Sequence, residues 1–84
     1  MNAIQNDDNL SLENEWPVKP YYKRVLAQAY APDISPVAAL NRLALWIKLN
    51  EPLSKALLET GYNLHRQVFT SRQVELIFRY LGRP

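Results

Sequence analysis

Apolar side chains recur at three- and four-residue spacing in four stretches of the chain, which is the period of an α-helix. This pattern predicts helices at residues 20–30, 37–49, 51–60 and 70–82. No stretch is long enough for a coiled coil, and no internal repeat is present. We therefore expect an all-α fold, a small orthogonal bundle of about four helices.

Residues that typically begin and end helices flank these stretches. Ser35 before Pro36 is a common helix start, because the hydroxyl caps the first turn and proline fits there. Asn50 is in the corresponding position before the third helix. Thr70 and Gln73 form the T-x-x-Q pattern of a capping box. The two glycines, Gly61 and Gly82, follow helices and are expected to end them.

The helical spacing also predicts which faces are buried. In the first helix the expected inner face is Tyr22, Val25, Leu26, Ala29 and Tyr30, with Lys23, Arg24, Ala27 and Gln28 outside. In the second helix a wide inner arc contains Val37, Ala39, Leu40, Leu43, Ala44, Trp46 and Ile47. We expect residues 62–69 to pack against the body through Leu64, Val68 and Phe69, and a short extended segment fits there.

The first sixteen residues differ in composition from the rest. Residues 1–16 are polar and contain four carboxylates and no Lys or Arg, so we expect a disordered acidic tail. Residues 17–84 contain all ten Lys and Arg against four acidic residues, and they form the single helical domain. A basic domain beside an acidic tail suggests an anionic partner, or a tail that shields the domain from one. A solubilising tail with no further role is the simpler alternative.

The residues present exclude most chemistry. The chain has no cysteine and one histidine, His65, so we expect no disulfide, no metal site and no cysteine nucleophile. Both glycines have expected structural roles, which leaves none for a phosphate-binding loop. We therefore expect no enzyme, no cofactor and no small-molecule substrate.

Protein binding is the leading hypothesis for function. Leu45 and Leu49 lie on the far side of the second helix, away from the expected core. Leu76 and Tyr80 lie on the expected outer stripe of the last helix, among charged residues. Apolar side chains among charges are typical of protein interfaces. The partner is another protein or a second copy of this chain, and the chain acts as a small adaptor or regulator.

DNA binding is the alternative. Arg72, Gln73 and Arg79 lie on the last helix, in the manner of a recognition helix, and Arg66 precedes it. Lys48 and Lys55 are candidate phosphate contacts. Against this, Arg72, Glu75 and Arg79 are also spaced for an ordinary salt-bridged surface.

The sequence gives a weaker indication of location. No apolar run approaches the roughly 20 residues that span a bilayer, and residues 1–16 do not resemble a signal peptide. The absence of cysteine fits a reducing compartment. We therefore expect a cytoplasmic protein.

Overall fold

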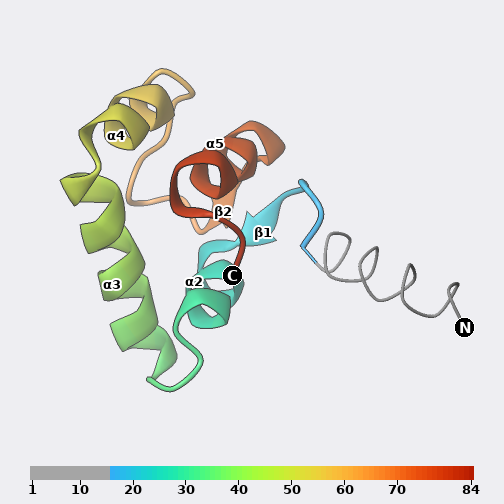
Figure 1. The fold of residues 1–84 in the computed structure, drawn as a ribbon, viewed down its shortest axis with the longest axis vertical. Coiled ribbons are helices and arrows are strands. Elements are labelled where there is room, and N and C mark those ends of the chain that lie inside the picture. Colours follow the sequence, from blue (N-terminus) through green and yellow to red (C-terminus); the bar gives the residue numbers. More distant parts are fainter. Residues whose placement is uncertain (1–15) are drawn as a thin grey trace, which may run out of the picture.

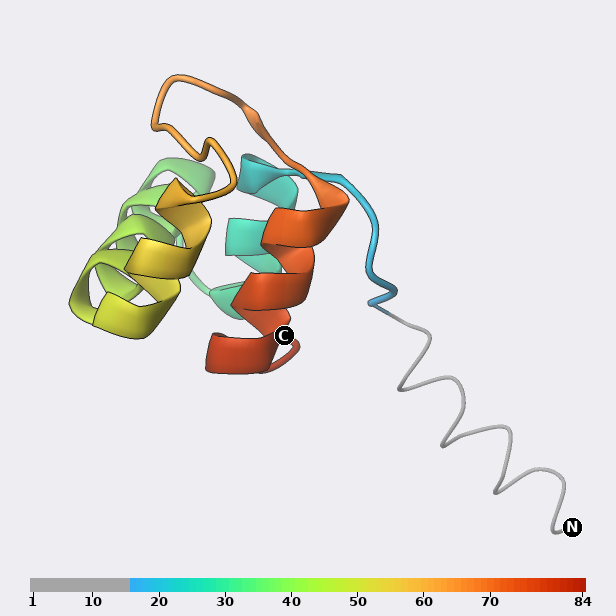
Figure 2. The ribbon, with the colours of Figure 1, turned by 90° about the horizontal axis from the view of Figure 1, so that it is seen from above.

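The structure is a computed structural model and describes residues 16–84. Along the chain the elements are β1 (Tyr21–Tyr22), α2 (Lys23–Tyr30), α3 (Pro36–Leu49), α4 (Glu51–Leu58), β2 (Val68–Phe69) and α5 (Ser71–Leu81). α3 and α4 form one side of the molecule and α2 and α5 the other (Figures 1 and 2). The prediction of a small all-α bundle is confirmed. The predicted tail lies outside the described residues, apart from Trp16.

The predicted helix starts are present with their hydrogen bonds. The Ser35 hydroxyl accepts from the amide of Ala38 at 3.2 Å, and the Asn50 side-chain oxygen accepts from the amide of Leu53 at 3.1 Å. Each bond satisfies an N–H that has no partner within its own helix. The sequence therefore located the beginnings of α3 and α4 correctly.

The capping box of α5 is also present. The Thr70 hydroxyl accepts from the Gln73 amide at 3.2 Å, and the Gln73 side-chain oxygen accepts from the Thr70 amide at 2.9 Å. Gly82 ends this helix with φ at +82°, a conformation that side chains with a Cβ rarely adopt. Both ends of α5 are thus determined by local sequence.

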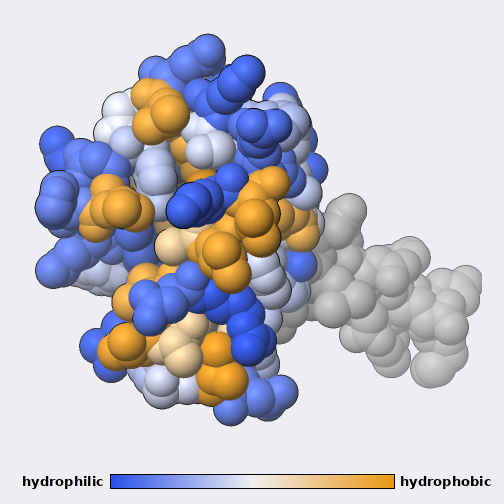
Figure 3. Space-filling view, turned by 90° about the vertical axis from the view of Figure 1, so that its left-hand side faces the viewer, coloured by the Kyte–Doolittle hydropathy of each residue, from blue (hydrophilic) through white to orange (hydrophobic). Residues whose placement is uncertain are grey.

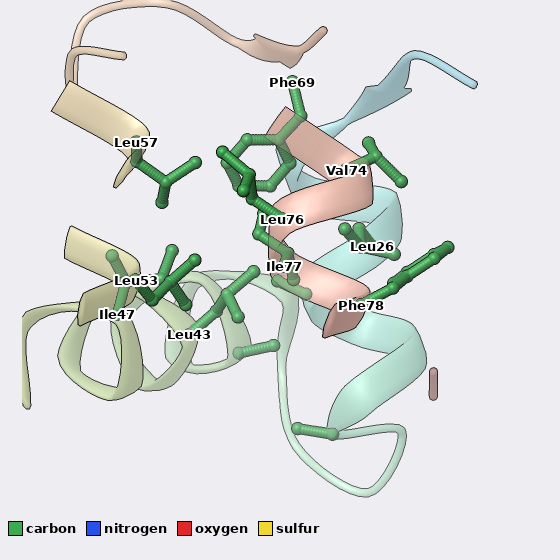
Figure 4. Close-up of a cluster of buried hydrophobic side chains, with 13 residues drawn as sticks. Leu26, Leu43, Ile47, Leu53, Leu57, Phe69, Val74, Leu76, Ile77 and Phe78 are labelled. Carbon is green, nitrogen blue, oxygen red and sulfur yellow. The ribbon is translucent and has the colours of Figure 1, made fainter. Parts of the chain in front are cut away.

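The core lies between the two sides of the bundle, and Tyr21 of β1 and Tyr62 of the 59–67 connection pack against it while partly buried. Figure 4 shows its larger side chains converging from α2, α3, α4, β2 and α5. The fully buried side chains of greatest volume are Phe69, Leu26, Leu53, Leu57, Ile77 and Val74. Phe69 and Val74 lie on either side of the capping box, at the two positions of a hydrophobic staple, and both are buried.

The buried face of α2 differs from the predicted one. Lys23, Leu26 and Ala27 are buried, whereas Tyr22 and Val25 are exposed. The pattern predicted that the most apolar face of the helix is buried. In the structure the helix is instead rotated so that Lys23 faces inward, where its ammonium group forms a hydrogen bond. Tyr22 lies before the helix, in β1. The prediction for these residues was wrong because it counted apolar side chains alone.

α3 buries a narrower face than expected. Only Ala39, Leu43 and Ile47 are buried, and Val37 and Trp46 remain exposed. Since α2 and α4 are the elements that contact α3 extensively, a single stripe at four-residue spacing is enough to make both contacts.

β1 and β2 form a two-residue antiparallel pair, with Tyr21 opposite Phe69 and Tyr22 opposite Val68. This pair joins the start of the domain to the segment before α5. The extended segment anticipated within residues 62–69 is therefore present. Leu64, however, does not pack down: it is 75% exposed.

The two ends of the described chain meet. The Arg83 side chain donates from Nε to the Trp16 carbonyl at 3.0 Å, and the Trp16 and Tyr21 ring centroids are 5.6 Å apart. Trp16, the last residue of the predicted tail, packs against the core. Nearby, the Tyr30 hydroxyl donates to the Gly82 carbonyl.

Alkaline pH should weaken the contact between the Tyr30 hydroxyl and the Gly82 carbonyl. Burial raises the pKa of Tyr30 to about 12. Because the folded protein favours the neutral phenol, its stabilisation is present below pH 10 and is lost as the pH rises from 10 through 12. Tyr30→Phe should cost about 0.5–1.5 kcal/mol at pH 7, through the lost hydrogen bond, and should flatten the alkaline decline. Urea unfolding at pH 7 to 11 measures both effects, and an unchanged decline would contradict the assignment.

Candidate functional site

Asn63 makes three of the hydrogen bonds that hold the connection between α4 and β2 in place. The side-chain oxygen of Asn63 accepts from the amides of His65 and Arg66, at 2.8 and 3.1 Å. Its backbone carbonyl accepts from the Lys23 ammonium at 2.8 Å. These bonds fix the turn at residues 63–66 and thereby direct Leu64, His65 and Arg66 outward, where all three are exposed.

Lys23 holds the same connection from α2. Its backbone amide donates to the Gln67 carbonyl at 2.8 Å, so the residue binds the connection through both main chain and side chain. The ammonium group lies 4.6 Å from the Tyr62 ring centroid and 5.4 Å from that of Phe69. Only 9% of Lys23 is exposed, and burial lowers the pKa of its ammonium group. The aromatic faces and the Asn63 carbonyl replace part of the lost hydration.

A groove of about 740 Å³ lies between α2 and this connection. We call it the α2 groove. Its lining combines exposed apolar groups from both sides with basic side chains: Tyr22, Lys23, Arg24, Val25, Leu40, Leu64, His65, Arg66 and Gln67. Tyr22 is 63% exposed and Leu64 75% exposed, so the apolar lining is largely open to solvent.

Three smaller hollows share lining residues with the groove, and two of them extend its exposed apolar lining. One, of about 310 Å³, shares Tyr22 and Val25 and extends to Lys19. The other, of about 410 Å³, shares Leu64 and extends along α3 to Leu45 and Lys48. The α2 groove and these two hollows thus form one continuous band on the surface. Figure 3 views the α3 side, where hydrophobic patches alternate with hydrophilic residues.

The band is basic. None of the residues that line it is Asp or Glu. Lys19, Arg24, Lys48 and Arg66 lie along it, and all four are exposed. Within residues 16–84 the only ion pair joins Arg72 to Glu75, at 2.6 Å, so none of these four cations is paired in the described part of the chain. The band therefore presents apolar groups and unneutralised positive charge together.

The predicted protein-interface residues do not form one surface. Leu45 and Leu49 are exposed on α3, and Tyr80 is exposed near the end of α5. Leu76 was expected on the outer stripe of α5, but it is only 3% exposed and lies among the core side chains (Figure 4). α5 buries Gln73, Val74, Leu76, Ile77 and Phe78, because β2 and α4 also cover it. Helical spacing alone does not predict this second contact.

The predicted nucleic-acid residues are dispersed as well. Gln73 is only 5% exposed. In addition to its bonds in the capping box, its side-chain Nε2 donates to the Thr60 hydroxyl at 3.0 Å, so the side chain is not available to read a base. Arg72 is paired with Glu75, and Arg79 is exposed on α5. Lys55 is exposed on α4, outside the band. Only Arg66 and Lys48 of this set line the band.

Several residues of the band escaped the sequence analysis. Tyr22, Val25 and Leu64 were expected to pack inward, Arg24 was placed on the outer face of its helix, and His65 was given no role in binding. The available signal was the run Tyr62–Gln67, which combines aromatic, apolar and basic residues with an asparagine able to fix a turn. Its pairing with α2 depends on Lys23 and could not be read from the pattern.

Other kinds of site lack their components in the described residues. Residues 16–84 contain no group of three or more His, Cys, Asp or Glu side chains placed to hold a metal ion. Over the same residues no helix is both long and apolar enough to cross a membrane.

Together these observations define a small helical domain with a basic, partly apolar surface band. The chain belongs to the family described as a domain of unknown function, DUF4248, whose model matches residues 17–84. No curated protein and no solved structure matches the chain. The matched range begins one residue after Trp16 and includes the whole band.

The Lys23 contacts give a local prediction. Lys23→Met keeps the aliphatic stem but removes the ammonium group, so the bond to Asn63 and the contacts with Tyr62 and Phe69 are lost. We expect the amides of His65 and Arg66 to exchange with solvent about tenfold faster, as loss of a charged hydrogen bond implies. Lys19→Met is the matched control, since Lys19 also lies over a tyrosine ring but is exposed. Equal exchange in both variants would contradict the role of Lys23.

Proposed function

We propose that the protein is a small non-enzymatic adaptor or regulator that binds an acidic, amphipathic segment of another protein in the α2 groove. The observation that supports this most directly is the lining itself, which places Tyr22, Val25 and Leu64 beside Arg24 and Arg66 without any carboxylate.

The apolar part favours a protein ligand. Val25 and Leu64 are largely open to water and face a concave surface, so a ligand with apolar side chains would remove their area from solvent. Burial of a leucine side chain contributes about 1.5–3 kcal/mol. Tyr22 adds a large side chain with few rotatable bonds, which loses little entropy when it is ordered. Exposed Tyr and Arg side chains are also common anchors in protein interfaces.

The charged part favours a protein ligand that is acidic. Arg24 and Arg66 are exposed and unpaired in the described residues, and a carboxylate can accept two parallel bonds from one guanidinium group. An acidic segment would therefore gain both affinity and a faster encounter rate, while a basic one would be repelled. The ligand chemistry that fits is a segment with leucine-like side chains among Asp or Glu.

DNA binding receives less support from the same geometry. A recognition helix must present side chains to the bases, but α5 has five of its residues buried and its Gln73 is occupied. The basic residues of the band remain compatible with phosphates, although phosphates would leave Val25 and Leu64 uncovered. A single-stranded oligonucleotide is therefore the appropriate competing ligand in a test.

The site of action that we propose is the cytoplasm. The absence of cysteine from the chain supports it, since it fits a reducing compartment.

The proposal predicts an order of binding for four labelled synthetic peptides of 15 residues. The first has leucines among glutamates, the second has glutamine in place of glutamate, the third has lysine, and the fourth is acidic with serine in place of leucine. Fluorescence anisotropy should rank the acidic leucine peptide first, and its Kd should rise with salt because exposed charges are screened. Equal binding of all four peptides, or tighter binding of a single-stranded oligonucleotide, would contradict the proposal.

Paired variants locate the binding on the protein. Leu64→Ser should weaken the acidic peptide about tenfold, in line with the lost burial of one apolar side chain. Leu58→Ser is its control, because Leu58 is similarly exposed on α4 but lines none of the hollows of the band. Arg66→Glu should weaken binding more than Arg79→Glu, although both variants change the net charge equally. If each pair behaves alike, the groove is not the binding site.

A further inference from the structure

The first fifteen residues of this chain have the chemistry that the α2 groove is expected to bind. They contain Asp7, Asp8, Glu13 and Glu15, with no Lys or Arg. Among these carboxylates lie the apolar side chains Ile4, Leu10 and Leu12. This is an acidic segment with leucine-like residues, which is the ligand class proposed above.

The segment is attached close to one end of the band. Trp16, to which it is joined, contacts Tyr21, and the smaller hollow at that end is lined by Lys19, Pro20, Tyr21 and Tyr22. From there the α2 groove follows a helix of eight residues, which is about 12 Å long. Fifteen residues reach at most about 50 Å, so the segment can extend past the attachment point into the groove.

The charges of the segment and of the band are opposite in sign. Lys19, Arg24, Arg66 and Lys48 lie along the band, and the segment contains four carboxylates. A tethered ligand is present at a high effective concentration, in the millimolar range for short flexible linkers. Even weak pairing would then be populated within one molecule before a partner arrives.

We infer that residues 1–15 occupy the α2 groove of their own chain and are displaced when a partner binds. The inference rests on the proposed function, since it assigns an intramolecular competitor to the same site. The occupant is a part of this chain acting in cis; a second copy acting in trans is the competing arrangement. The segment then sets a threshold, because a partner must bind more tightly than the tethered sequence in order to replace it.

Spin labelling of the full chain tests the contact directly. The chain contains no cysteine, so Asn9→Cys accepts a single nitroxide label at a defined position. Amide signals of Val25, Leu64 and Arg66 should be broadened, whereas those of Leu49 and Leu58, outside the α2 groove, should remain sharp. The broadening should disappear in the variant Asp7→Asn, Asp8→Asn, Glu13→Gln, Glu15→Gln.

A mixed sample separates cis from trans. Isotope-labelled protein without the nitroxide is combined with unlabelled protein that has it, so that only contacts between molecules broaden the observed signals. The inference requires little broadening in the mixed sample and clear broadening in the single-chain sample. Broadening in the mixed sample of the same size, or none at the groove in either sample, overturns it.

Peptide affinity gives an independent measure. If the segment occupies the groove for about 70–90% of the time, the quadruple variant should bind the acidic leucine peptide about three- to tenfold more tightly than the wild-type chain. The matched control neutralises the four acids of the domain: Asp33→Asn, Glu51→Gln, Glu59→Gln and Glu75→Gln. Both variants change the net charge by the same amount, so equal gains would overturn the inference.

The two proposals fail in different ways. If no peptide binds but the groove amides are broadened, the self-contact stands and the adaptor function is wrong. If peptides bind in the predicted order without any broadening at the groove, the adaptor function stands and the inference is wrong.

Discussion

The placement of Lys23 is the interaction on which the surface of this domain depends. A buried ammonium group is costly unless its lost hydration is replaced, and here a carbonyl and two aromatic faces replace part of it. With these contacts made, α2 has Lys23 turned inward and Val25 outward, and Tyr22, just before the helix in β1, is exposed as well. The same contacts hold the 59–67 connection against the helix. One charged side chain therefore determines both which apolar groups are exposed and which segment they face.

This arrangement also explains why a small domain leaves so many apolar side chains in water. An 84-residue chain has little core to build, and the buried residues here form a single cluster. Because Val25 and Leu64 are exposed, the fold lacks the stabilisation that burial of their apolar surface would provide. In the proposed function that area is recovered on binding, and in the inference about residues 1–15 it is recovered within the same chain.

Much of the fold could be predicted from local signals. Helix starts are determined by hydrogen bonds between residues three positions apart, so the local sequence is enough to predict them. Here the capping residues are Ser35, Asn50 and Thr70 with its partner Gln73. The faces were harder to predict. Leu76 is buried because β2 and α4 approach α5 from a second direction, a tertiary contact that helical spacing does not encode.

The candidate site was predicted least well, and for the same reason. Its residues come from α2 and from a connection about forty positions further along, and they meet through one lysine that was assigned to the solvent face. Arg66 and Lys48 were recognised as charged candidates, and Leu45 as an apolar one, but nothing in their spacing indicated that they share a band.

The hydrogen bond between Arg83 and Trp16 has a separate consequence for the architecture. Because the two ends of residues 16–84 are adjacent, this part of the chain resembles a closed loop. A short linker could join these ends and new ends be opened elsewhere, or the unit could be inserted into a surface loop of another protein without separating that loop's flanks.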